Sequence, residues 1–182
     1  MATSMQIVGV GSYVTVLEPK PDQKGKLKYS VTILVPKSLT KSLDPLKAEA
    51  VRVAKEKWGA KGEAILAAAK NPMIHDGDTY VGTSGEPDPS YKGNWFIRMR
   101  TDRKPQVIDA KKQPVFTDDD VYSGCLLRVS GNVFAYEREG NRGVTFGLNN
   151  VQVLEKRARL DGRKAAEDEF EEWKPEGGDP LA

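Results

Sequence analysis

Apolar and polar residues alternate with a period of two in several segments, which is typical of strands that bury one face. The longest such segments are residues 7–17, 27–35, 95–101, 125–136 and 143–154. Shorter strands are expected at 106–109, near 114–116 and at 79–81. A glycine-containing loop at 18–26 and a turn at 138–142 separate neighbouring strands, as in hairpins.

Residues 44–58 have the period of a helix instead. Asp44 suits an N-cap, Pro45 suits the first helical position and Gly59 suits the C-terminal stop. The apolar stripe of this helix predicts packing on a sheet, through Leu46, Ala50, Val53, Ala54 and Trp58. A second, short helix is expected at 63–70. Because the strands do not alternate with helices, the pattern predicts a mainly β fold: an OB-like antiparallel barrel with one or two inserted α-helices, with a β-sandwich as the alternative.

Two of the predicted strands carry cationic or aromatic residues opposite their apolar face. In strand 95–101 the inward set is Trp95, Ile97 and Met99, and the outward set is Phe96, Arg98 and Arg100. In strand 125–136 the inward set is Leu127, Val129, Val133 and Ala135, and the outward set is Arg128, Ser130, Asn132, Phe134 and Tyr136. The alternative is that the three aromatic rings of the outward sets belong to the core beneath the helix.

Cations beside aromatic rings suit a single-stranded polynucleotide, because the cations follow the phosphates and the rings stack on bases of any sequence. Further cations on the 18–26 loop and after strand 95–101 extend the same surface. The predicted DNA-binding residues are Lys24, Lys26, Lys28, Phe96, Arg98, Arg100, Arg103, Arg128, Asn132, Phe134 and Tyr136.

The charge of the chain is divided unevenly. Residues 165–182 contain seven acidic residues and one basic residue, a side-chain charge of −6, which leaves 27 basic and 19 acidic residues, or +8, in the remainder. This favours a body that meets polyanions and a tail that does not. One cysteine, no secretory signal and no long apolar run predict a cytoplasmic protein without disulfides.

The acidic tail contains two aromatic residues, which suggests a binding motif in an otherwise disordered segment. The predicted partner-binding residues are Glu169, Phe170, Glu171, Glu172 and Trp173. The tail could dock on basic grooves of partner proteins, fold over the DNA groove, or pack its rings on the barrel. We expect an OB-fold domain at 1–160 and a flexible tail at 161–182.

No catalytic or metal-binding set is expected. Two segments could suggest a magnesium-dependent nuclease or resolvase: His75 with Asp76 and Asp78, and the run 118–120. A transition-metal site, however, normally needs three or four converging ligands, and the chain has one histidine. Turns explain both segments better. A non-enzymatic structural or adaptor protein is the other alternative. We therefore expect no enzyme activity, no cofactor and no metal.

Several segments occur in an order that resembles a known family. They are 28–37 (KYSVTILVPK), 54–59 (AKEKWG), 76–78 (DGD), 122–124 (YSG) and 144–152 (VTFGLNNVQ). Together they resemble the phage-encoded OB-fold single-stranded DNA-binding proteins of enterobacterial phage type, formerly a family of unknown function. The resemblance spans approximately residues 7–156.

The resemblance implies action in phage DNA replication or recombination without base specificity, in the cytoplasm of an infected bacterial cell. It also implies an acidic C-terminal tail that contacts replisome partners and modulates DNA access. Short-tailed-phage relatives end in an aromatic residue, whereas this chain ends in 179–182 (DPLA) and has its aromatics at Phe170 and Trp173. This departure leaves the identity of the partner open.

Overall fold

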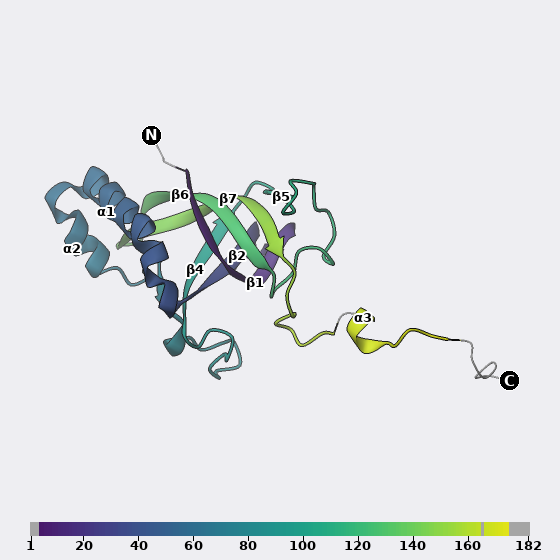
Figure 1. Ribbon diagram of the computed structural model, residues 1–182. Helices are drawn as coiled ribbons and strands as arrows, with labels where there is room; N and C mark the ends of the chain where they lie inside the picture. The colour runs from purple at the N-terminus through teal and green to yellow at the C-terminus, as the bar shows by residue number, and fades with distance from the viewer. Residues whose placement is uncertain (1–3, 165, 175–182) are drawn as a thin grey trace.

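A computed structural model describes residues 4–164 and 166–174 of the chain. Its centre is a barrel of five strands: β1 (Ser4–Pro21), β2 (Leu27–Pro36), β4 (Asn94–Thr101), β6 (Leu126–Arg138) and β7 (Asn141–Glu155) (Figure 1). The strands pair in the order β4–β2–β1–β6–β7, and a pairing between β4 and β7 closes the barrel. The closing pair is parallel and the other four are antiparallel. The predicted OB-like barrel is confirmed.

Two short strands extend the sheet at its margins. β3 (His75–Asp76) pairs with β4, and β5 (Gln106–Ile108) pairs in parallel with β7. The strands predicted near 114–116 and at 79–81 are reduced to single bridges, Ile108 with Pro114 and Val81 with Pro87. The chain between β4 and β6 therefore consists mostly of turns and loops around β5.

The inserted helices follow β2. A 3-10 helix, η1 (Lys37–Leu43), leads without a break into α1 (Asp44–Trp58), and η2 (Gly59–Lys61) leads into α2 (Gly62–Ala67). The predicted bounds of the first helix match α1, and Gly59 ends it with φ 61°. The predicted N-cap is wrong: because η1 runs directly into α1, Leu43 takes that position and no side chain caps the helix. A further 3-10 turn, η3 (Gly77–Thr79), follows β3.

The inward faces of the strands form the core as their alternation predicts. Ile97 and Met99 of β4 and Leu127 and Val129 of β6 are fully buried. Burying a side chain of this size contributes about 1.5–3 kcal/mol to folding. Helix α1 packs on β6 and β7, and α1 and α2 lie on the same side of the barrel (Figure 1). The barrel and α1 therefore share one core, to which the helix contributes Leu46, Ala50 and Ala54.

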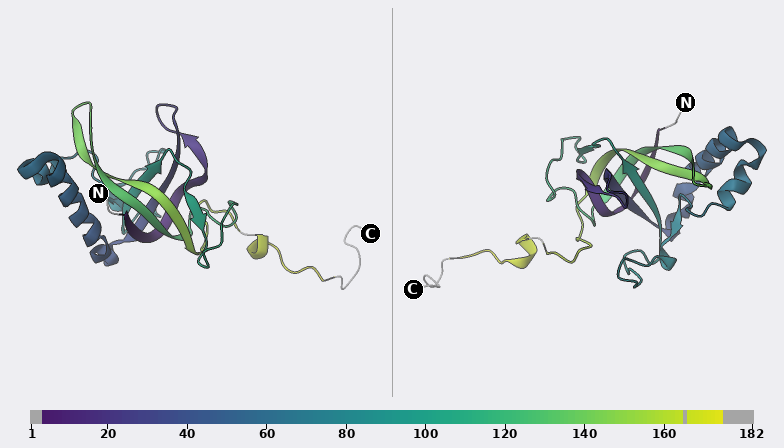
Figure 2. Two further views of the ribbon diagram at one scale, coloured as in Figure 1. Left: turned by 90° about the horizontal axis from the view of Figure 1, so that it is seen from above. Right: turned by 180° about the vertical axis from the view of Figure 1, so that it is seen from behind.

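Two hairpins project from the same end of the barrel, as the left view of Figure 2 shows. The β6–β7 turn consists of Glu139 and Gly140, both with positive φ, 51° and 78°. This is the backbone of a two-residue type I′ turn, which matches the twist of the flanking strands. In the β1–β2 loop, Asp22 Oδ1 accepts hydrogen bonds from the backbone N–H groups of Lys24 and Lys26, at 2.8 and 2.9 Å.

After β7 the chain first remains on the barrel. The backbone N–H of Leu160 donates to the Ser123 carbonyl at 2.9 Å, and the Arg159 guanidinium lies 4.1 Å from the centre of the Tyr122 ring. A short helix, α3 (Ala166–Glu169), follows. Phe170 and Trp173 are 72% and 71% exposed, so the alternative in which these rings pack on the barrel is wrong. Part of the predicted flexible tail, residue 165 and residues 175–182, lies outside the described residues.

Candidate nucleic-acid interface

A groove of about 520 Å³ lies on the outer face of the barrel, against the β1–β2 loop. Five predicted DNA-binding residues line it: Lys28 of β2, Arg98 and Arg100 of β4, and Phe134 and Tyr136 of β6. Its described lining residues include one lysine, two arginines and no carboxylate. OB folds bind oligonucleotides on the face of their second and third strands, between the loops of the first and last hairpins. In this chain β2, β4 and the two projecting hairpins occupy those positions.

Phe134 presents a ring to this groove. Its side chain is 50% exposed, and it lies over Gly147 of β7, where an added Cβ would sit 2.9 Å from the ring. The missing side chain at Gly147 thus lets the ring lie against the strand. Tyr136 is half-buried, and its hydroxyl donates to the Asn71 carbonyl at 3.4 Å. An exposed ring on a rigid strand is a suitable platform for base stacking.

Arg98 and Arg100 are the exposed cations of the groove floor. The Arg98 guanidinium lies 5.2 Å from the centre of the Phe96 ring and 5.5 Å from that of Tyr80, so aromatic faces position it. Within residues 4–164 and 166–174, neither arginine forms an ion pair with a carboxylate. Both guanidinium groups are therefore available to phosphate.

The lysines beside the groove are less available. Lys26 Nζ lies 2.7 Å from Asp102 Oδ2, and Lys28 pairs with the other oxygen of the same carboxylate. Hydrogen bonds from Lys26 and Lys28 lower the pKa of Asp102 to about 2, so this carboxylate offsets part of their charge at neutral pH. Lys24 lies exposed on the β1–β2 loop, and Arg103 lies exposed directly after Asp102.

Phe96 does not present a stacking surface, which corrects the prediction. It is on the outward face of β4, as expected, but only 3% of its surface is exposed. The segment 73–93 folds back over that face, so Phe96 packs against Leu34 and Tyr91 in a small second core. The alternation of a strand identifies which face a residue is on, but it does not reveal what another segment places over that face.

His75 occupies the position at the groove that Phe96 was expected to hold. Its ring is stacked on Phe96, with 4.7 Å between centroids and 10° between planes, and it lines the groove. Burial, and secondarily the charge of Arg98, lower the pKa of His75 below its ordinary value, so the ring is neutral at pH 7. Sequence reasoning assigned His75 to a turn and missed this role.

Two predicted residues of β6 lie outside the groove, further along the same face of the strand. Asn132 Oδ1 accepts a hydrogen bond from Asn149 Nδ2 at 2.6 Å. The Arg128 guanidinium donates to Gln152 Oε1 at 3.2 Å and lines a separate, smaller pocket. The two-residue alternation predicts the face of both residues correctly, but only part of the predicted DNA-binding residues line the groove.

Several of the carboxylates considered as metal ligands form ion pairs with lysines instead. Lys37 Nζ lies 2.7 Å from Asp76 Oδ1 and also binds Asp78. Asp120 pairs with Lys156 at 2.5 Å. In the part of the chain that the structure describes, no three potential metal ligands gather at one point. The same residues contain no helix long and apolar enough to span a membrane.

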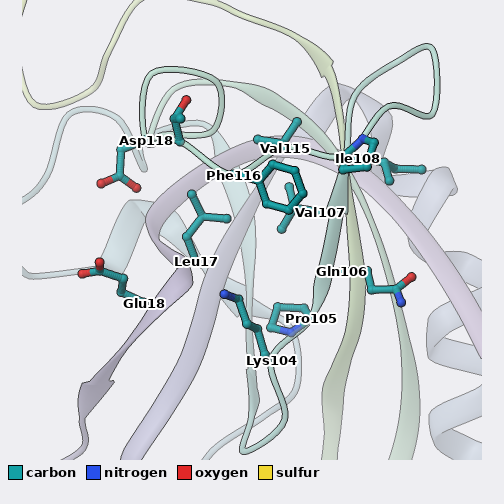
Figure 3. Close-up of a pocket in the computed structure, with 12 residues that line it drawn as sticks. Leu17, Glu18, Lys104, Pro105, Gln106, Val107, Ile108, Val115, Phe116 and Asp118 are labelled. Carbon is teal, nitrogen blue, oxygen red and sulfur yellow. The ribbon is translucent and has the colours of Figure 1, made fainter.

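A larger hollow of about 740 Å³ lies between β1, β5 and the loop after β5 (Figure 3). Figure 3 shows Leu17, Val107, Val115 and the ring of Phe116, which is 81% exposed, in the lining of this hollow. The charged residues of its lining are Glu18, Asp118 and Lys104. Because acidic residues outnumber basic ones in its lining, this hollow suits a polyanion less well than the groove does.

The barrel with its cationic, aromatic groove defines an OB-fold protein of the single-strand-binding type. Comparison with known proteins gives the family. The profile described as "Enterobacter phage Enc34, ssDNA-binding protein" matches residues 8–180, and the chain belongs to this family of phage single-stranded DNA-binding proteins. The predicted family is thus confirmed, and the family is one of DNA-binding proteins rather than enzymes.

Three individual proteins are similar to this chain. "Putative protein p50" of Acyrthosiphon pisum secondary endosymbiont phage 1 is 33% identical over 156 residues, which cover 82% of this chain and 81% of that protein. The single-stranded DNA-binding protein of bacteriophage Enc34, solved in complex with ssDNA, has a TM-score of 0.66 at 21% identity, covering 86% of this chain and 88% of that one. Bacteriophage T7 gp2.5, a single-stranded DNA-binding protein, has a TM-score of 0.58 at 18% identity, covering 92% of each chain. These two structures share the fold.

Proposed function

We propose that this protein binds single-stranded DNA without sequence specificity in the groove lined by Arg98, Arg100, Phe134 and Tyr136, and acts in phage DNA replication or recombination. The observation that carries the proposal is the composition of the groove. The guanidinium groups of Arg98 and Arg100, which form no ion pair within the described residues, lie beside an exposed ring, and no described lining residue is acidic. Phosphate contacts supply affinity and base stacking supplies preference for single strands. The position of the groove agrees with that used by OB folds.

A titration of oligo-dT and of duplex DNA at several salt concentrations tests this function. We expect oligo-dT to bind more tightly than duplex and its affinity to fall steeply as salt rises. Arg98→Ala and Arg100→Ala should each lower the slope of log affinity against log salt by about 0.7, the loss of one phosphate contact on a single strand. Arg52→Ala is the matched control, because Arg52 is already paired with Glu49 and Glu56 on α1, at 2.7 Å each.

Absence of oligo-dT binding at low salt would contradict the proposal and favour an adaptor protein. Cleavage of labelled DNA in the presence of magnesium would favour the nuclease alternative instead.

The chain after the barrel has a second proposed role. Phe170 and Trp173 are exposed and flanked by Glu169, Glu171 and Glu172, which suits an acidic peptide that docks on a basic site of another protein. We propose that residues 161–182 form a tail that binds replication or recombination proteins in the cytoplasm of the infected host cell. The barrel domain, residues 1–160, would then hold the DNA.

A further inference from the structure

The pocket that contains Arg128 is built from four strands, not from one. The register of β1, β6, β7 and β5 aligns two rows of outward side chains across the sheet. One row consists of Gln6, Ser130, Asn150 and Gln106, and the next consists of Val8, Arg128, Gln152 and Ile108. All of these residues except Val8 line a pocket of about 210 Å³. We call it the amide pocket, after Gln6, Gln106, Asn150 and Gln152.

Several of these polar groups are held in place by hydrogen bonds. The backbone N–H of Gln106 donates to Asn150 Oδ1 at 3.2 Å, and Gln152 Nε2 donates to the Asp109 carbonyl at 3.2 Å. Arg128 donates to Gln152 Oε1 at 3.2 Å, which uses one of the five N–H donors of its guanidinium. The remaining donors of Arg128 are available to a ligand, as is the exposed amide of Gln6.

This set of groups suits a nucleotide. A guanidinium binds phosphate, and side-chain amides match the paired donors and acceptors on the edges of bases. As in the groove, no carboxylate lines the pocket among the described residues. A carboxylate in the lining would repel phosphate, so a lining without one leaves both hollows suited to the same ligand. Asp102, beside the groove, is paired with Lys26 and Lys28.

The outward face of β6 connects the groove to the amide pocket. Phe134 lines the groove and Arg128 lines the pocket, six residues apart, or roughly 20 Å along a strand. Between them lie Asn132 and Ser130, both polar. A bulge in β7 opposite Ser130 leaves Asn149 and Asn150 both exposed, and Asn149 is bonded to Asn132. The surface between the hollows is therefore polar and neutral, with hydrogen-bonding side chains along its length.

We propose that the amide pocket is a second nucleotide subsite, which binds the continuation of the same single strand that occupies the groove. Arg128 binds a phosphate, and the amides, beginning with Gln6, contact the edge of a base. The inference rests on the proposed function, because the strand must first occupy the groove. It differs from that function in predicting an effect that depends on the length of the DNA.

Two lengths of oligo-dT, about five and about twelve nucleotides, test the proposal within the range of roughly 4–16 nucleotides that one OB fold covers. The short strand fills the groove and the long one reaches the amide pocket as well. Arg128→Ala should lower the affinity of the long strand about fivefold or more, the loss of a charge-assisted hydrogen bond to phosphate, and leave that of the short strand unchanged. It should also lower the salt slope of the long strand by about 0.7.

Gln6→Ala should weaken binding of the long strand alone without changing the salt slope, since it removes no charge. Arg98→Ala should weaken binding of both lengths, and Arg52→Ala should weaken neither. If Arg128→Ala has no effect on the long strand, or affects both lengths equally, the subsite is disproved while the groove stands. If the wild-type protein binds neither length, the proposed function fails and the subsite fails with it.

Discussion

At the scale of single residues, two phenylalanines on the outer face of the barrel have different roles. Phe134 is half-exposed in the groove, so Phe134→Ala removes a stacking surface and little core. We expect the affinity for oligo-dT to fall by about 1–3 kcal/mol, with an unchanged salt slope and nearly unchanged stability. A titration at three salt concentrations measures the affinity and the salt slope, and denaturant unfolding measures the stability. Phe134→Tyr, which keeps a ring, should retain most of the affinity.

Phe96 should behave in the opposite way. Because it is buried against Leu34, Tyr91 and His75, Phe96→Ala leaves a cavity, and we expect the free energy of unfolding to fall by about 3–5 kcal/mol. Denaturant unfolding measures this loss. A variant that keeps full stability but loses DNA affinity would show that the ring contacts DNA after all.

His75 should make DNA binding depend on pH. Its pKa in the free protein lies below the ordinary 6.5, and an approaching phosphate raises it, so binding takes up a proton. The affinity for oligo-dT should therefore increase as the pH falls from about 7.5 to about 5.5, near the ordinary pKa of histidine. Lys28, Arg98 and Arg100 are the other charged groups of the groove. His75→Phe keeps the stacking and should abolish the dependence.

The lowered pKa of His75 also makes the stability of the fold depend on pH, in the direction opposite to that of DNA affinity. The unfolded chain binds the proton of His75 at a higher pH than the folded chain does, so stability falls as the pH drops below about 6.5. Unfolding experiments across this range should show a smaller loss for His75→Phe than for the wild-type protein. An identical loss in both would assign the effect to other groups.

At the scale of secondary-structure elements, the β6–β7 hairpin contains an unfavourable residue. Glu139 adopts φ 51°, a left-handed conformation that asparagine tolerates better than glutamate does. Glu139→Asn should increase the free energy of unfolding by about 0.5–1 kcal/mol, as measured by denaturant titration. Glu139→Gln removes the same charge without the preference for this conformation, and it should give no gain.

The sequence predicted the elements well and their assembly only in part. The faces of Arg98, Arg100, Phe134 and Tyr136 follow from the two-residue period of a strand, which is a local property. The burial of Phe96 and the place of His75 depend on a loop that folds back over β4, and no local pattern encodes that contact. The amide pocket depends likewise on the register of four strands, which brings Gln6 to Ser130 over more than a hundred residues of chain.

At the scale of the whole molecule, the charges of barrel and tail oppose each other. Removal of residues 165–182 takes away a side-chain charge of −6 and leaves a chain of +8. If the tail competes with DNA for the groove, its removal should raise the affinity for oligo-dT several-fold at low salt, and the gain should shrink as screening increases. Phe170→Ala combined with Trp173→Ala tests whether the rings contribute beyond charge. Unchanged affinity after truncation would leave only the proposed docking on partners.

The closure of the barrel by β4 and β7 has a consequence for synthesis of the protein. The closing pair joins Met99 to Phe146, and β1 finds its second neighbour only in β6. A nascent chain that has emerged only as far as β4 therefore displays open strand edges, which are prone to pair with other chains. Those edges are covered only after the last hairpin has been synthesised, and the proposed DNA groove, which includes residues of β6 and β7, is complete only then.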